Sequence, residues 1–410
     1  MTAASTFLRE GLAVAIAMLS APLLADLAVG IAGNLRRAAK PSAGAREIRM
    51  AVLVPAHDEQ AMIARAVQSL LGAGCAPHTG REAAGDGSGP WRVPVIVVAH
   101  NCTDQTAAAA AAAGARVVEL NHVMMKGKAG ALRCGFEAAR AAGANAFLVV
   151  DADSVVSPNL IAATRAALSG GAAAAQCRYE LELPATRPAT AQERLRVLAF
   201  RAMNVLRARG RAGLGFSAGV FGNGFALTGE TLQQVPFTVD SICEDLEYHV
   251  WLVTAGLKVA WVDDAHVHAP LAPARSARAS QEARWEGGRF HVATRSTGRL
   301  LAAIASGNWR ALEALSEAWS LPVSRGILAL LLAACLPVDW LHGFAAAGAL
   351  LILAYALVAA GLGSQPRSDL AALAAAPVHV LWKLALTPLV LRQSRAGAEW
   401  SRTQREVRTP

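Results

Sequence analysis

The sequence predicts an α/β fold with a doubly wound, mostly parallel sheet, flanked by transmembrane helices. Three observations support this prediction. Short apolar runs alternate with helical segments between residues 50 and 150. Acidic residues follow the ends of several of these runs, where open α/β sheets bind their ligands. Apolar stretches long enough to cross a bilayer lie towards both ends of the 410-residue chain.

The composition favours a membrane surface as a partner. The chain is 54% hydrophobic and 17% charged, and its mean hydropathy is +0.34. The formal charge of +9 is compatible with nucleic-acid binding. However, the arginines lie mostly beside apolar segments, so we expect an anionic membrane surface and no nucleic acid. The six cysteines are scattered without a C-x-x-C pair, which favours reduced, buried thiols over a disulfide framework or a zinc site.

The first apolar stretch, residues 11–33, contains one charged residue, Asp26, and is predicted to span the membrane. Basic residues at 36, 37 and 40 follow it, and the positive-inside rule then places the next portion in the cytoplasm. A cleavable signal peptide is the alternative. The apolar region is long for a signal peptide, and Arg9 lies beside Glu10, so we favour an anchor.

The C-terminal part is predicted to return to the membrane. Residues 344–361 form a clear span, and residues 319–338 can form another if Arg325 snorkels to the surface. Residues 370–391 include a histidine and a lysine, so they form either a third span or an interfacial helix. The arginine-rich tail, residues 392–408, is expected in the cytoplasm. The predicted location is therefore the inner (cytoplasmic) membrane, crossed several times.

Three segments follow from this organisation. Residues 1–40 are the anchor and a basic linker, residues 41–310 a cytoplasmic α/β domain, and residues 311–410 the C-terminal transmembrane or interfacial helices with a basic tail. Within the α/β domain, strands are predicted at 50–55, 93–99, 116–120, 146–150, 172–183 and 259–262. Helices are predicted at 56–71, 103–113, 129–142, 190–209, 241–255 and 281–295, and residues 72–91 form a loop.

The turns after the first, second and fourth strands are expected to meet. Right-handed crossovers bring the carboxyl ends of parallel strands to one edge of a sheet. The segments 55–59, 100–104 and 151–153 should therefore enclose one crevice.

Asp151 and Asp153 follow a buried strand and are candidates for a metal site. Mg²⁺ prefers one or two carboxylates together with phosphate oxygens, so a cation carrying a substrate phosphate fits this pair. The alternative is that these residues cap the following helix, because Ser154 and Ser157-Pro158 also resemble a helix start.

Three other motifs each have a functional and a structural interpretation. Lys126 and Lys128 flank Gly127 and can reach phosphates, or they are solvated loop lysines. The acids at 244 and 245 open a helix, where they can act chemically or stabilise the helix dipole. An Arg-Trp pair at 284 and 285 can bind a sugar, or it packs and anchors at a membrane interface.

Six motifs occur in a fixed order along the chain: Val54-Pro55-Ala56-His57-Asp58-Glu59, Asn101-Cys102-Thr103-Asp104, Lys126-Gly127-Lys128, Asp151-Ala152-Asp153, Glu244-Asp245 and Gln281-x-x-Arg284-Trp285. Together they resemble the family 2 glycosyltransferases, which have the GT-A fold. The last motif resembles the membrane-bound branch that includes cellulose, chitin, hyaluronan and poly-N-acetylglucosamine synthases. The resemblance covers about residues 49–295.

The resemblance implies an inverting, metal-dependent transferase. It would move a sugar from a nucleotide-sugar, expected to be a UDP-sugar, to a polysaccharide or lipid-linked acceptor at the cytoplasmic membrane face, forming a β-glycosidic bond. Asp153 would hold Mg²⁺ or Mn²⁺, and Asp151 would share the metal or hold the ribose. By the same resemblance, Pro55, Ala56, Glu59 and Asp104 line the nucleotide pocket, and Lys126 and Lys128 contact the phosphates.

On the acceptor side, Asp245 is the expected general base, with Glu244 beside it. Direct displacement at the anomeric carbon needs an acceptor hydroxyl deprotonated on the face opposite the diphosphate. Gln281, Arg284 and Trp285 lie within about one helical turn and are expected to contact the acceptor or the diphosphate.

The sequence departs from the family pattern at two positions. His100 stands where the family usually has an aspartate that contacts uracil, and Cys243 precedes Glu244 where a threonine is usual. The segment Gly222-Asn223-Gly224 resembles the family's glycine-rich loop on the acceptor side. His57, His266 and His268 are further candidate metal ligands, but no pair of them has typical zinc spacing.

Two alternatives come from other functional classes. An inactive GT-A module acting as a membrane scaffold or nucleotide-sugar sensor is favoured by His100 and disfavoured by the retained acids. A nucleotidyltransferase would have a glycine- and arginine-rich loop after the first strand, where this chain has residues 56–59. Because few spans make a poor secretion channel, a homo-oligomer or an export partner is a possible addition for a polysaccharide product.

Overall fold

The structure is a computed structural model, and it describes residues 3–36, 44, 46–78, 91–122, 127–239, 241–272 and 275–394. The chain forms two compact units. One, here called the helical unit, contains Met1–Ala38, Leu183–Phe216 and Ala279–Ala398. The other, the sheet unit, contains Ala39–Glu182, Ser217–Arg278 and Glu399–Pro410. Residues 183–216, expected in the α/β domain, thus group with the apolar helices. The functional division into anchor, catalytic domain and C-terminal helices stays a prediction.

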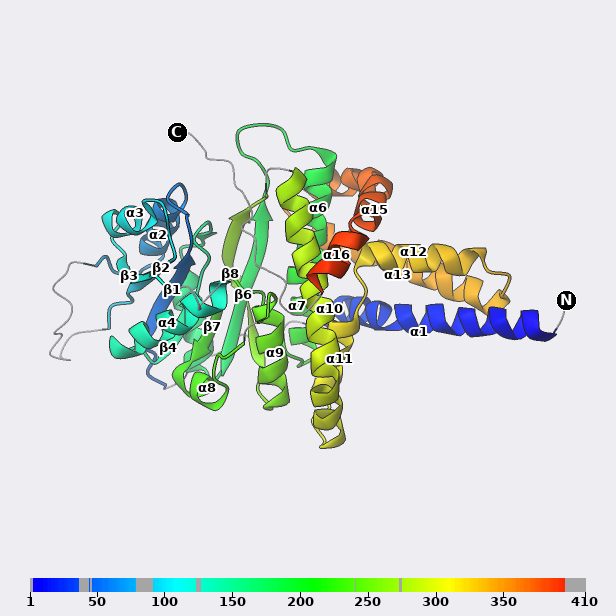
Figure 1. The fold of residues 1–410 in the computed structure, drawn as a ribbon, viewed down its shortest axis with the longest axis horizontal. Helices are drawn as coiled ribbons and strands as arrows, with labels where there is room; N and C mark the ends of the chain where they lie inside the picture. Colours follow the sequence, from blue (N-terminus) through cyan, green and yellow to red (C-terminus); the bar gives the residue numbers. More distant parts are fainter. Residues whose placement is uncertain are drawn as a thin grey trace. The chain divides into compact units, whose positions relative to one another are not determined.

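The sheet unit is built on one eight-stranded sheet with the order β3-β2-β1-β4-β7-β6-β8-β5 (Figure 1). The strands are β1 (Met50–Ala56), β2 (Val95–His100), β3 (Arg116–Leu120), β4 (Ala146–Val149), β5 (Val155–Val156), β6 (Ala174–Glu182), β7 (Phe225–Thr228) and β8 (Val259–Pro270). The first four are parallel, and β6 and β8 are also parallel. β7 and β5 run antiparallel to their neighbours. The predicted α/β class is confirmed, with a sheet that is mixed rather than uniformly parallel.

Both faces of the sheet are covered, which explains the continuous apolar runs in its strands. Met50, Val52 and Val54 of β1 face one buried cluster, and Ala51 and Leu53 face another. The first cluster takes side chains from α2 (Ile63–Gly72), α3 (Thr106–Ala112) and α5 (Leu160–Ser169). The second takes them from α4 (Gly127–Ala141), α8 (Gly229–Gln234) and α9 (Glu244–Thr254). This doubly wound arrangement leaves the strand ends as the open edge.

Two element boundaries in the sheet unit differ from the prediction. The helix expected from residue 56 begins only at Ile63, because Asp58 has φ of 51° and its carboxylate accepts the backbone N–H of Thr103 at 2.6 Å. The strand expected at 259–262 continues to Pro270, because it keeps pairing with β6 beyond an irregularity at Cys177/Arg178. In both cases tertiary hydrogen bonds override the local sequence pattern.

The helical unit contains α1 (Ala3–Asn34), α6 (Ala191–Arg201), the π-helix η2 (Ala202–Leu206), α7 (Arg207–Gly213), α10 (Arg275–Ala305, of which residues from 279 onwards belong to this unit), α11 (Ala311–Trp319), α12 (Val323–Cys335), α13 (Asp339–Gly361), α14 (Pro366–Ala371), η3 (Ala372–Ala375), α15 (Ala376–Ala385) and α16 (Thr387–Gln393). The helix predicted at 190–209 is therefore α6, η2 and α7 in succession. The helix predicted at 281–295 lies inside the much longer α10.

Among the described residues, two helices are long and apolar enough to cross a membrane: Thr6–Asn34 and Asp339–Gly361. They contain the spans predicted at 11–33 and 344–361. The span predicted at 319–338 is not one straight helix, because α11 and α12 meet at 75°. The segment predicted at 370–391 is also bent, by 49° before α16. Each bent pair can count as one further span, which gives up to four.

Asp26, the one charge in the first predicted span, is buried in an ion-pair cluster. Its Oδ1 accepts hydrogen bonds from Arg211 at 2.6 and 3.2 Å. Arg211 also pairs with Glu313 at 3.2 Å and Glu317 at 2.7 Å, and only 1% of its side chain is exposed. Nearby, a Cβ on Gly33 would lie 1.7 Å from the Gly210 carbonyl oxygen, so α1 and α7 cross at backbone contact. The charge is tolerated because it is paired.

Candidate functional site

Asp151 and Asp153 lie just beyond β4, as the sequence predicts, and neither caps a helix. The next long helix, α5, begins at Leu160 with Asn159 as its N-cap. Asp153 is buried and accepts a hydrogen bond from Ser154 Oγ at 3.2 Å, while Asp151 is half-buried. The helix-cap interpretation of this pair is therefore wrong. Two carboxylates close together at a strand end are suited to binding a cation.

A lysine already neutralises one of these carboxylates. Lys128 Nζ, in the first turn of α4, forms an ion pair with Asp151 Oδ1 and donates to the Gly222 carbonyl at 2.6 Å. Burial lowers the pKa of Lys128, but the carboxylates of Asp151, Glu244 and Asp245 outweigh this and raise the pKa above its ordinary value. Lys128 is therefore a permanent cation among three acids. Lys126 lies outside the described residues.

Glu244 and Asp245 open helix α9, on the other side of Gly222 from the strand end. A Cβ on Gly222 would lie 3.2 Å from Asp245 Oδ2 and 3.6 Å from Lys128 Nζ, so both side chains flank this glycine. Asp245 Oδ1 accepts the Leu246 N–H at 2.8 Å, which orients the carboxylate at the positive end of the helix. Burial, and then the neighbouring Asp245 carboxylate, raise the pKa of Glu244 to about 7.

Two amide side chains that the sequence analysis did not single out join these elements. Asn223 is fully buried; its Oδ1 accepts the Asp151 N–H at 3.0 Å and its Nδ2 donates to Ser154 Oγ at 2.8 Å. Gln176, also fully buried, donates to the Asn223 carbonyl at 2.8 Å and accepts the Phe221 N–H at 3.0 Å. The glycine-rich loop is thereby fixed to the strand end. Asn223 was visible only as the middle residue of Gly222-Asn223-Gly224.

The turns after β1 and β2, which carry the expected nucleotide-pocket residues, are hydrogen-bonded to each other. Asp104 Oδ2 accepts the Gln60 N–H at 3.2 Å and its Oδ1 accepts the Thr106 N–H at 2.9 Å. Glu59 contributes its N–H to Thr106 Oγ1 at 2.7 Å. Pro55 is partly exposed and Ala56 is buried. Asp104 thus holds the two turns together and starts α3, in addition to any contact with a ligand.

His100, the departure from the family pattern, is almost fully buried at 5% exposure. Its carbonyl oxygen lies 2.8 Å from His57 Nδ1, and its Nε2 lies 3.3 Å from Asn101 Nδ2. The adjacent Asn101 has φ of 49° and accepts the His122 N–H at 2.8 Å. The imidazole therefore belongs to the framework of the turn.

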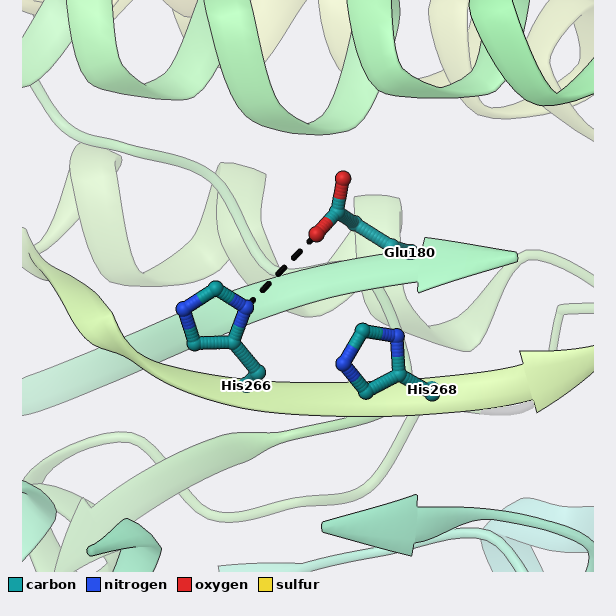
Figure 2. A group of neighbouring side chains, drawn as sticks. All are labelled: Glu180, His266 and His268. Carbon is teal, nitrogen blue, oxygen red and sulfur yellow. Dashed lines mark ion pairs between the residues drawn. The ribbon is translucent and has the colours of Figure 1, made fainter. Parts of the chain in front are cut away.

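A third group of candidate ligands combines two predicted histidines with a glutamate (Figure 2). One ligand atom from each of Glu180, His266 and His268 lies within 4.8 Å of the others, on the neighbouring strands β6 and β8. His266 Nδ1 is 3.6 Å from Glu180 Oε2, and the two imidazoles stack with centroids 5.7 Å apart. Burial lowers the pKa of His268, which favours a neutral ring. Arg178 pairs with both oxygens of Glu180, at 2.9 and 3.2 Å, so this carboxylate is already neutralised.

Gln281, Arg284 and Trp285 lie within one turn of α10, as predicted. They were expected in the α/β domain, whereas this part of α10 belongs to the helical unit. All three side chains are partly exposed. Trp285 packs against Phe200 of α6, with ring centroids 6.2 Å apart. The aromatic ring therefore has a packing role within its own unit.

The residues present fit a hard divalent cation. Asp151 and Asp153 supply oxygen ligands two residues apart, and an ammonium already lies against one of them. Such a pair prefers Mg²⁺ or Mn²⁺ to softer metals. Lys128 contacts one oxygen of Asp151, and Ser154 Oγ donates to one oxygen of Asp153.

Residues 48–288 match the family model described as Glycosyltransferase like family 2. A search of curated proteins gave no match.

A search of solved structures gave several matches. A mannosyltransferase from Pyrobaculum calidifontis, in complex with GDP-Man and Mn²⁺, aligns with 91% of this chain and 99% of its own, at 20% identity and a TM-score of 0.52. Mannosyl-3-phosphoglycerate synthase from Rubrobacter xylanophilus aligns with 62% of this chain and 76% of its own, at 22% identity and a TM-score of 0.41. Glucosyl-3-phosphoglycerate synthase from Mycobacterium tuberculosis, with Mn²⁺, UDP and phosphoglyceric acid, aligns with 53% and 68%, at 22% identity and a TM-score of 0.35. The likeness to the first structure confirms the predicted GT-A-like fold.

Proposed function

The chain belongs to glycosyltransferase family 2, which confirms the predicted enzyme class, and on this premise we propose that it is an inverting, metal-dependent transferase acting at a membrane. The donor is a nucleotide-sugar, with a UDP-sugar as the first candidate. The reaction forms a β-glycosidic bond and releases a nucleoside diphosphate. The proposal rests chiefly on one observation: Asp151, Lys128 and Asp245 are gathered around Gly222 at the end of β4.

The donor's diphosphate is assigned to the carboxylate side of this cluster. Asp153 and Asp151 would hold Mg²⁺ or Mn²⁺, which when bound neutralises the charge that develops on the departing diphosphate. Lys128 is positioned to add a second positive charge there. The turns carrying Pro55, Ala56, Glu59 and Asp104 form the nucleotide side, and Asp104 keeps them together through its bonds to Gln60 and Thr106.

Asp245 is assigned as the general base. It takes the proton from the acceptor hydroxyl as that oxygen bonds to the anomeric carbon, while the bond from this carbon to the diphosphate oxygen breaks. The start of α9 and the nearby Lys128 both favour an ionised Asp245 carboxylate. Glu244 lies beside it, and burial and the Asp245 carboxylate raise the pKa of Glu244 to about 7.

The acceptor is proposed to be a polysaccharide or lipid-linked sugar at the cytoplasmic membrane face. Gln281, Arg284 and Trp285 support a polysaccharide, because the motif is that of the cellulose and hyaluronan synthase branch. The described residues offer two to four candidate spans, and this small number supports a lipid-linked acceptor, because so few helices make a poor secretion channel on their own. The proposed location is the inner membrane with the sheet unit in the cytoplasm.

A panel of UDP-, GDP- and TDP-sugars tests the function. The full chain in membranes is given each labelled donor with Mn²⁺, and products are analysed by mass spectrometry. We expect one donor to give equal amounts of released nucleoside diphosphate and transferred sugar, and EDTA to stop both. A ladder of products would identify a polymer, and a single lipid-soluble product a glycolipid. Binding of a donor without any transfer would favour the inactive scaffold instead.

A further inference from the structure

Helix α11 buries its acidic side chains and exposes apolar ones, which is the reverse of the usual pattern in a surface helix. Its acidic residues Glu313 and Glu317 are buried and pair with Arg211. Its apolar residues Leu312 and Trp319 are 60% and 40% exposed. A helix in contact with water normally shows its charges and buries its leucines. The exposed side of α11 is therefore suited to a partner that is itself apolar.

The orientation of α11 follows from the helices beside it. α12 packs along α1 and α13: a Cβ on Gly326 would lie 2.2 Å from Leu23, and one on Gly348 would lie 2.9 Å from Leu330 (Figure 1). α1 and α13 are the two helices long enough to cross a bilayer among the described residues. α11 is bent by 75° from α12. If α12 is parallel to α1 and α13 and these two helices cross the membrane, α11 lies close to the plane of the membrane surface.

The residues around α11 have the composition of a membrane interface. Trp309 and Phe290 are 54% and 50% exposed, and Phe290 contacts Trp319 with ring centroids 6.2 Å apart. The Arg310 guanidinium lies over Trp309, 5.3 Å from the ring centroid. Tryptophans of this kind are enriched at the headgroup level of membranes. Between Glu286 and Glu313 the chain has four arginines and no acidic residue.

We propose that the exposed surface formed by Phe290, Trp309, Leu312 and Trp319 lies in the headgroup region of an anionic phospholipid bilayer. The apolar side chains enter the boundary between headgroups and acyl chains, and the arginines at 295, 299 and 310 are near the lipid phosphates. Two features favour lipid over a protein partner. The surface carries one sign of charge, and α12, the helix that follows α11, also exposes leucines, at 331 and 332.

Photolabelling in nanodiscs tests this proposal on the full chain. The discs contain phosphatidylcholine with about 30% phosphatidylglycerol, and the probe is a phospholipid with a diazirine close to its acyl carbonyl. We expect labelled peptides from residues 309–319 and from α13, whose Leu350 is 67% exposed. Replacing phosphatidylglycerol by phosphatidylcholine should lower the labelling of 309–319 several-fold and leave α13 unchanged.

Matched variants sharpen the test. Leu312→Glu should reduce labelling of α11 at least fivefold without reducing that of α13, whereas Gln234→Glu, on exposed α8, should change neither. The proposal is overturned if α13 is labelled and 309–319 is not, if labelling ignores lipid charge, or if 309–319 crosslinks instead to a protein. If α13 is not labelled, the premise that α13 crosses the bilayer is wrong, and the proposal falls with it. No donor is present, so the result is independent of the proposed transferase activity.

Discussion

At the residue scale, the site is a balance of one cation against three acids. Lys128 contacts Asp151 directly, and Asp245 lies near it across Gly222. Without the Lys128 ammonium, these carboxylates would repel one another. A bound divalent cation would neutralise part of the same negative charge. This arrangement links the donor side to the base side of the proposed reaction.

Glu244 gives a stability prediction that depends on pH. Its pKa is raised from 4.5 to about 7 in the folded chain, so protonation contributes stability that is fully present below about pH 4.5 and is lost as the pH rises through about 7. Glu244→Gln, which stays neutral, should therefore match the metal-free wild type at pH 5 and exceed it at pH 8. Thermal unfolding at both pH values measures this. Equal melting temperatures of the two proteins at pH 8 would contradict it.

The residues carrying charge were predictable, whereas those positioning them were not. Asp151, Asp153 and Asp245 stood out because acids at strand ends and helix starts have recognisable neighbours. Asn223 and Gln176 did not, because a buried amide is identified only by the partners that the fold brings to it. Asp104 shows the converse: its sequence context suggests ligand binding, but the structure gives both of its oxygens protein donors.

At the scale of elements, the loop from Phe221 to Gly224 connects the two halves of the site. Gly222 has φ of 72° and sits under Asp245 and Lys128. Gly222→Ala should reduce kcat about 10- to 100-fold, because the added methyl group displaces Asp245 as well as straining the backbone.

Gly256→Ala is the matched control for this substitution. Gly256 has a similar φ of 79°, but a Cβ there meets no atom within 4 Å. The control should therefore lose some stability and keep its kcat. Equal losses of kcat in the two variants would mean that strain, and not Asp245, accounts for the effect.

Lys383 of α15 gives a prediction about the helix that carries Gln281, Arg284 and Trp285. Its ammonium pairs with Glu282 and, at 2.9 Å, with Glu286 of α10, and Arg325 pairs with Glu286 at 2.6 Å. If this helix binds the acceptor, Lys383→Met should raise the acceptor KM about tenfold and leave donor binding unchanged, because breaking a buried ion pair shifts its helix.

Two further variants control for a general loss of structure. Lys383→Arg keeps the charge and should restore most of the acceptor affinity. Lys258→Met, at an exposed position in the sheet unit, should have no effect. Loss of donor binding in Lys383→Met would instead indicate a merely structural role.

Prediction of elements succeeded where periodicity was strong and failed at boundaries. The four parallel strands were identified because apolar runs ending in polar turns are distinctive. The late start of α2 depends on the left-handed backbone at Asp58 and its bond to Thr103, which local pattern does not reveal. By contrast, the break between α11 and α12 at 320–322 contains Pro322, which cannot continue a helix and is visible in the sequence.

At the scale of the whole molecule, apolar length predicted the two helices that are long and apolar enough to cross a membrane, α1 and α13. Sequence alone did not predict the composition of the helical unit, which gathers three separated segments of the chain. Asp26 illustrates the reason. In sequence it is an isolated charge within a span, and only the fold supplies Arg211 as its partner.

The central claim is that Asp245 promotes an inverting transfer from a nucleotide-sugar. The most direct test gives wild type and Asp245→Asn the same ¹³C-labelled, α-linked donor with Mn²⁺ and reads the anomeric configuration of the product by NMR. We predict a β-linked product from wild type, and a loss of about 10²- to 10⁴-fold in the variant with donor affinity preserved. An α-linked product, or full activity of Asp245→Asn, would contradict the account.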